Sequence, residues 1–117
     1  MYQSLVLSMV ILFLGLDLTA PAAMAAEEAS VTITSPADGA KLDAKVQNKL
    51  VYDVKPGPLG DHVHVYVDGK QAGILRQLKS SHTLPTLTPG SRNICVKVVT
   101  KAHVPIGVER CVKVAVE

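Results

Sequence analysis

The stretch that most constrains the fold runs from Asp61 to Lys70. Its residues alternate strictly, with valines at every second position and, between them, His62, His64 and Tyr66. A period of two is that of a β-strand with one buried and one exposed face. We therefore expect the valines to face a core and the histidines to lie on the outer, exposed face of a sheet.

This strand ends at a strong turn signal. The dipeptide Asp68-Gly69 tolerates positive φ at both central positions of a type I′ turn, so residues 71–75 are expected to return antiparallel. Residues on the same face of a strand lie roughly 6.5 to 7 Å apart. His62 and His64 are therefore close enough to lean onto one metal ion, at about 2.0 to 2.1 Å per nitrogen.

The first 25 residues resemble an export signal. An apolar run covers residues 5–16, and small residues at Ala23 and Ala25 mark a cleavage site after Ala25. The segment before the apolar run has no Lys or Arg, and an uncleaved anchor is the alternative, which Asp17 disfavours. The protein is therefore expected to be periplasmic or secreted, with no membrane attachment after cleavage.

The remaining segment, residues 26–117, has room for one small domain. It keeps all 12 Lys and Arg and loses one of the 10 acidic residues, so its formal charge is +3, and its basic residues are scattered. Its aromatic side chains other than histidine are Tyr52 and Tyr66. Binding of nucleic acid or of a polysaccharide through stacked aromatic rings is therefore disfavoured.

The rest of the chain is predicted to form further short strands. No segment has the pattern of a helix, and Pro and Gly turn signals recur about every 8 to 12 residues. Such a chain is typical of an all-β, immunoglobulin-like or fibronectin-III-like β-sandwich of about seven antiparallel strands. The predicted strands are 31–35, 49–55, 62–67, 71–75, 81–87, 92–100 and 108–116.

The last two predicted strands bring the two cysteines together. A hairpin centred on His103 pairs Cys95 with Cys111 on the outer face, beside a Lys97/Glu109 pair. An exported protein meets an oxidising compartment, so a disulfide is predicted. A dithiol metal or redox site is the alternative. The same register places Arg110 on the core-facing side, which the sequence does not explain.

The four histidines are predicted to meet at one end of the sandwich. In this topology alternate connections lie at the same end. His62 and His82 begin strands there and His103 lies in the last loop, while His64 is one pleat further along. A shared metal site at His62, His64, His82 and His103 is therefore predicted.

Imidazole ligands suit Zn(II), Cu(II) or Ni(II), and three of them leave an open fourth position. A blue-copper site is disfavoured because Cys95 lies eight residues before His103, and a Met-rich Cu(I) carrier because every Met precedes residue 25. The alternative is that the histidines keep an edge soluble, hydrogen-bond a turn at His82, or shape the loop at His103.

Three segments together look similar to a group of small secreted bacterial domains of uncharacterised function, with an immunoglobulin-like fold and a His-bearing central strand. They are residues 62–70, His82-Thr-Leu with the later Pro89-Gly90, and residues 102–107. The chain differs from that group in having His-x-His rather than consecutive histidines, in placing His-Thr-Leu before Pro-Gly, and in its cysteine pair. The resemblance implies a periplasmic domain and no activity.

The sequence therefore favours a non-enzymatic binding domain with Cu(II) or Zn(II) as its ligand. The alternative is an accessory domain that binds a protein partner without metal, for example by adding a strand to a free sheet edge. An enzyme is disfavoured because the chain has no evident nucleophile motif and no paired-carboxylate spacing.

Overall fold

The computed structural model describes residue 15 and residues 27–117. Apart from Gly15, the expected signal segment lies outside the described residues. The described part forms eight β-strands in two sheets and contains no helix, so no helix in it is long enough to cross a membrane. The predicted all-β sandwich is confirmed.

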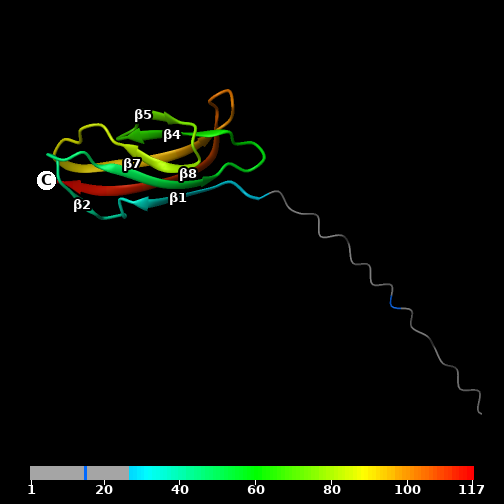
Figure 1. Ribbon diagram of the computed structural model, residues 1–117, viewed down its shortest axis with the longest axis horizontal. Helices are drawn as coiled ribbons and strands as arrows, with labels where there is room; N and C mark the ends of the chain where they lie inside the picture. Colours follow the sequence, from blue (N-terminus) through cyan, green and yellow to red (C-terminus); the bar gives the residue numbers. More distant parts are fainter. Residues whose placement is uncertain (1–14, 16–26) are drawn as a thin grey trace, which may run out of the picture.

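The smaller sheet has three antiparallel strands in the order β1-β3-β6. They are β1 (Ser30–Ser35), β3 (Lys49–Lys55) and β6 (Lys79–Thr83). The larger sheet has the order β2-β8-β7-β4-β5 and packs against the first (Figure 1). Its strands are β2 (Lys41–Leu42), β4 (His62–Val67), β5 (Lys70–Leu75), β7 (Gly90–Val99) and β8 (Pro105–Val116).

The strand pattern of the sequence is largely reproduced. Strands β3 and β4 have the predicted bounds, and the others are shifted at their ends by one to four residues. Strand β6 ends at Thr83, before Pro85, because proline cannot donate to the ladder. The short strand β2 was not predicted, since two residues carry no periodicity. It pairs parallel with β8, whereas all strands were predicted to be antiparallel.

The core lies between the two sheets and is aliphatic. The valines of β4 that alternate with the histidines face it, and Val63 and Val65 are fully buried. They meet Leu50 of β3 and Val96 of β7, which are also fully buried. Burial of a Val or Leu side chain contributes about 1.5 to 3 kcal/mol. The core therefore fixes the face on which the histidines lie.

The predicted hairpin after β4 is confirmed. Asp68 and Gly69 have φ values of 49° and 79°, as a type I′ turn requires, and β5 pairs antiparallel with β4. Strand β5 lies at the edge of the larger sheet.

The predicted register of β7 and β8 is confirmed up to Lys97; beyond it the ladder shifts, so that Val99 lies opposite Pro105. Cys95 lies opposite Cys111 and forms a disulfide with it, and Lys97 lies opposite Glu109, with 3.7 Å between their charged atoms. Both pairs are on the outer face of the larger sheet. The prediction of a disulfide is therefore confirmed, and oxidised cysteines do not form the alternative dithiol site.

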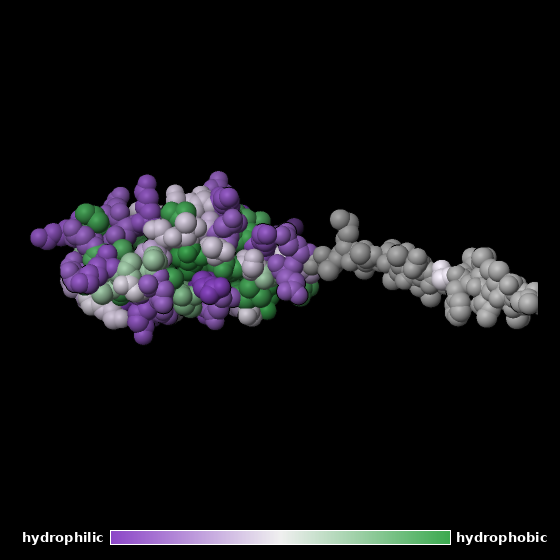
Figure 2. Space-filling model, turned by 90° about the horizontal axis from the view of Figure 1, so that it is seen from below, coloured by the Kyte–Doolittle hydropathy of each residue, from purple (hydrophilic) through white to green (hydrophobic). Residues whose placement is uncertain are grey.

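Arg110 lies opposite Val96, as predicted, yet its side chain is exposed. It lines a depression of about 290 Å³ together with Thr32 and Ile33 of β1, where the edges of the two sheets meet. On the side of the domain seen from below in Figure 2, near β1 and β2, hydrophobic side chains reach the surface between hydrophilic ones. Arg110 therefore reaches solvent beside β1 and does not enter the core.

Candidate metal centre

Three imidazole rings converge at one end of the larger sheet. His62 Nε2 lies 3.3 Å from His64 Nε2 and 3.1 Å from His103 Nδ1, and the His64 and His103 nitrogens are 3.0 Å apart. The ring centroids are 4.7 to 5.2 Å apart. One nitrogen of each ring therefore points to a common centre, as the ligands of one metal ion do.

Two of the rings are placed by β4. His62 and His64 are two residues apart on one strand, so both project from the outer face of the sheet. Strand β7 pairs with β4 so that Val99 lies opposite His62. The chain then leaves β7 at the level of His62, and the β7–β8 loop curls past the start of β4 (orange in Figure 1).

The third ring is placed by that loop, residues 100–104. The Thr100 hydroxyl accepts hydrogen bonds from the backbone N–H groups of Ala102 and Val104, each at 3.2 Å. The His103 N–H donates to the Thr100 carbonyl at 2.9 Å, and the Thr100 N–H donates to the Val104 carbonyl at 2.8 Å. His103 has a φ of 65°, in the left-handed region that few non-glycine residues adopt. Thr100 thus closes a tight loop that aims His103 at β4.

The predicted exposure of the strand histidines was wrong. His62 is 1% exposed and His64 is 4% exposed, although both lie on the outer face as predicted. Each ring packs against His103, which remains exposed itself. A strand pattern indicates the face of a residue but cannot indicate whether a distant loop folds over it.

Asp61 fixes the orientation of His62. Its carboxylate oxygen Oδ2 lies 2.9 Å from His62 Nδ1 and 3.9 Å from Arg76 Nη1. A carboxylate only accepts hydrogen bonds, so Nδ1 carries the ring proton and the Nε2 lone pair faces the other two rings. Metal-binding histidines commonly have such a carboxylate on the far nitrogen.

The nitrogen triangle has the dimensions of a metal tripod. Tetrahedral zinc with bonds of about 2.0 to 2.1 Å places its ligand nitrogens about 3.3 Å apart. The observed separations of 3.0 to 3.3 Å are close to this value, so the three nitrogens would hold such an ion together. The arrangement fits a three-histidine cap on one side of an ion.

The surroundings of His64 favour its neutral form. Burial lowers the pKa of His64 below its usual value, and the positive charges that His62 and His103 carry when protonated lower it further. A neutral imidazole has the free lone pair that a metal needs. His64 therefore keeps its ligand form to a lower pH than an exposed histidine does.

The fourth histidine does not join the cluster. His82 lies on β6, in the other sheet, opposite the fully buried Leu50 and therefore on the inner side. Its Nε2 is buried without a hydrogen-bond partner, and a Cβ atom on Gly73 would lie 3.0 Å from it. The predicted convergence of four histidines is corrected to three, because His82 faces the space between the sheets.

The sequence did not predict the roles of two residues near the site, Thr100 and Arg76. Thr100 follows the last residue of β7, and a threonine there is a known signal for a turn closed by its hydroxyl. Arg76 has no sequence signal, since its position near Asp61 depends on the pairing of β5 with β4.

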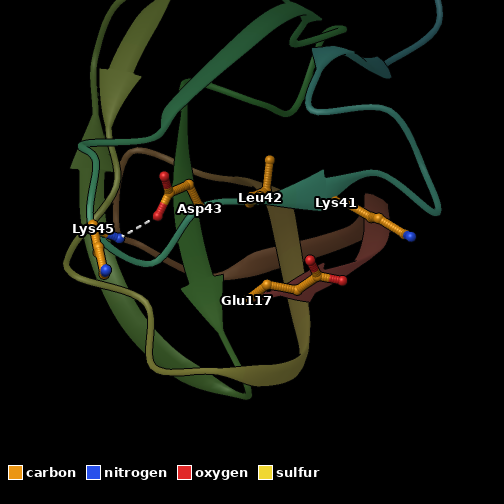
Figure 3. Close-up of a pocket in the computed structure, with 5 residues that line it drawn as sticks. All are labelled: Lys41, Leu42, Asp43, Lys45 and Glu117. Atoms are coloured by element: carbon orange, nitrogen blue, oxygen red, sulfur yellow. Dashed lines mark hydrogen bonds between the residues drawn. The ribbon is translucent and has the colours of Figure 1, made fainter.

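A depression of about 450 Å³ lies at the other end of β8, lined by Lys41, Leu42, Asp43, Lys45 and Glu117. In Figure 3 the Lys41 side chain points away from Glu117, and Asp43 bonds to the backbone N–H of Lys45 at 2.8 Å. These side chains do not converge on a common point, so this depression is not a candidate site.

Comparison with known proteins gives no match to a family and none to a characterised protein by sequence. Solved structures do match. Fibronectin(III)-like modules of Clostridium thermocellum CbhA align with a TM-score of 0.62 and 18% identity, over 74% of this chain and 95% of the module.

Larger proteins contain similar domains. An engineered protein aligns with a TM-score of 0.54 and 21% identity over 77% of this chain, and a Bacteroides ovatus protein, SGBP-B, with 0.51 and 18% over 78%. The chain spans 20% and 25% of these two proteins. At these identities the matches establish the fold alone: the described domain is a fibronectin-III-like β-sandwich.

Proposed function

We propose that this chain is an exported, non-enzymatic domain that binds Cu(II) or Zn(II) through His62, His64 and His103. The observation that carries the proposal is the triangle of ring nitrogens, with sides of 3.0, 3.1 and 3.3 Å. His103 is 41 residues from His62 and comes from a different element. Local sequence does not bring these side chains together, and the shared binding of one metal ion explains why they meet.

The cost of the arrangement supports the proposal. Only one proton fits between two ring nitrogens, so three rings that face one another leave lone pairs opposed. Burial also lowers the pKa of His64, which penalises its charged form. A metal ion relieves both costs because it accepts all three lone pairs.

The ligand set selects the class of metal. Imidazole nitrogen suits Cu(II) and Zn(II), whereas Cu(I) carriers use thiolate and thioether sulfur. Both cysteines are in the disulfide, and the three methionines all lie within the first 25 residues. A mature domain therefore offers no thiolate or thioether ligand.

Export is supported by three observations. The chain begins with a signal-like segment, its cysteines form a disulfide, and similar folds occur in extracellular proteins, such as an extracellular domain from B. thetaiotaomicron with a TM-score of 0.54 and 12% identity. We propose a periplasmic or secreted location, without a membrane anchor after cleavage.

Calorimetry tests the metal site. The full chain, exported to an oxidising compartment and stripped with chelator, is titrated with Cu(II) and Zn(II) beside His62→Ala/His103→Ala and the matched control His82→Ala. We expect one ion per chain with a dissociation constant below about 1 μM, which is about 8 kcal/mol. The double variant should lose binding and the control should keep it. Equal binding by all three proteins would refute the proposal.

A second candidate function is capture of a protein partner. Strand β5 is a sheet edge, and Ile74 on it is 46% exposed, so an extended segment of a partner has a strand to pair with. This function predicts partner capture that the histidine variants do not change. A pull-down with the chelated wild type and the double variant separates the two functions.

Binding of a glycan is not proposed. The B. ovatus neighbour was solved with a mixed-linkage heptasaccharide. In the part of this chain that the structure describes, Tyr52 is 2% exposed and Tyr66 has the Lys97 ammonium 4.7 Å above its ring. Neither ring offers a free face on which a sugar could stack.

A further inference from the structure

The proposed centre has fewer protein ligands than a metal ion takes. Among residues 27–117, the group of donor atoms that converges here consists of His62, His64 and His103. Zinc takes at least four ligands, and three histidines leave the remaining position to a non-protein ligand. The identity of that ligand depends on what surrounds the open side.

Neighbouring donors are directed elsewhere. The Asp61 carboxylate lies against Nδ1 of His62, on the opposite edge of the ring from Nε2, and so cannot reach the ion. The Tyr66 ring is 6.4 Å from the His64 ring and lies under Lys97. His82 faces Gly73 between the sheets. Among the His, Cys, Asp and Glu side chains of residues 27–117, no fourth one joins the three histidines.

The three histidines would hold a metal ion from one side and leave its other side free for a further ligand. His103 forms one corner of the triangle and is exposed, whereas His62 and His64 are buried. An incoming ligand therefore reaches the ion along the His103 side.

The charges around the centre favour an anion. Asp61 is balanced by Arg76 at 3.9 Å, and Glu109 is balanced by Lys97 at 3.7 Å. Three neutral imidazoles leave the double positive charge of the ion uncompensated. Charge interactions strengthen where water is partly excluded, as it is beside two buried rings.

We infer that the metal-loaded protein binds a small anion, such as a halide, azide or a simple carboxylate, directly at the open position of the ion. This inference rests on the proposed metal site. The anion replaces a coordinated water molecule, and no electron transfer or bond cleavage within the anion is involved.

Azide is the probe. The full exported chain is loaded with one Cu(II), and azide is added while the azide-to-copper charge-transfer absorption is recorded. We expect saturation at one azide per copper, with copper retained on the protein after ultrafiltration. Copper that binds one-to-one but shows no azide band would overturn the inference and leave the metal site standing. Copper released into the filtrate would also overturn it. Failure of copper itself to bind would refute the metal site instead.

A charge variant tests the anion preference. Arg76→Gln keeps all three ligands and removes a positive charge near the centre, so azide binding should weaken about two- to fivefold. Lys41→Gln, an exposed residue at the other end of the larger sheet, is the matched control and should change nothing. Equal azide affinity in the Arg76 variant and the control would overturn the claim that charge selects the ligand.

Discussion

Each of the three converging histidines contributes differently to the centre. The proton of His62 is held on Nδ1 by Asp61, so its other nitrogen is free. Burial lowers the pKa of His64, which favours its neutral form. His103 is exposed and depends on its loop for position. The two strand residues form the rigid half of the site, and the loop residue completes it.

The stability of the metal-free protein should decrease as the pH decreases. The pKa of His64 is lowered in the folded state, whereas the unfolded chain takes up this proton at about pH 6.5. From there down to the lowered pKa, the unfolded state binds more protons, so the free energy of unfolding decreases as pH decreases. The urea midpoint should drop as the pH falls below about 7, and less in His64→Gln. Identical pH profiles for the two proteins would contradict this account.

Asp61 should matter for affinity although it does not touch the ion. Asp61→Asn weakens the acceptor for His62 Nδ1–H and lets the ring change tautomer, so copper affinity should fall about 10- to 100-fold. Asp53→Asn, an acidic residue on β3 paired with Lys79, is the matched control. Calorimetry measures the copper affinity of both variants, and equal affinities would show that Asp61 has no role in metal binding.

At the scale of elements, the β7–β8 loop determines whether the site is preformed. Thr100→Val keeps the side-chain shape and removes the hydroxyl that accepts two backbone hydrogen bonds. Each hydrogen bond contributes about 0.5 to 1.5 kcal/mol. Without them the loop is less ordered in the metal-free protein, and ordering it on binding should lower copper affinity about three- to tenfold. Thr100→Ser should bind like wild type, with the same stoichiometry in all three. Wild-type affinity in the valine variant would show that the loop keeps its conformation without the Thr100 hydroxyl.

The connection from β3 into β4 is the second element that places the site. Gly60 donates to the Pro56 carbonyl at 3.1 Å, and a Cβ atom here would overlap that carbonyl and lie 2.6 Å from Val98 Cγ1. Gly60→Ala should lower the free energy of unfolding by about 1 to 3 kcal/mol, measured by urea denaturation. Unchanged stability would mean that this connection relaxes without cost.

For the whole molecule, the disulfide is a covalent constraint between two neighbouring strands. It links residues 16 apart across β7 and β8. Removing it with Cys95→Ser/Cys111→Ser should cost about 3 kcal/mol of stability. The ladder of β7 and β8 keeps its register without the bridge, so metal stoichiometry should remain one. A double variant that keeps wild-type stability but loses metal binding would contradict the view that the disulfide serves stability and not metal binding.

The sequence predicted the parts of the fold that follow from alternation. The β4–β5 hairpin, the β7–β8 register and the cysteine pair all depend on a period of two and on turn residues, which are local. The burial of His62 and His64 was not predictable, because it depends on a loop about 40 residues away. The inward position of His82 depends on the sheet to which β6 belongs, which local pattern does not fix.

Diffraction from zinc-loaded crystals, with data collected at the zinc absorption edge, tests the metal centre most directly. We expect one anomalous peak within about 2.0 to 2.1 Å of His62 Nε2, His64 Nε2 and His103 Nδ1. A fully loaded protein with its zinc elsewhere, or with no zinc at these three nitrogens, would contradict this expectation.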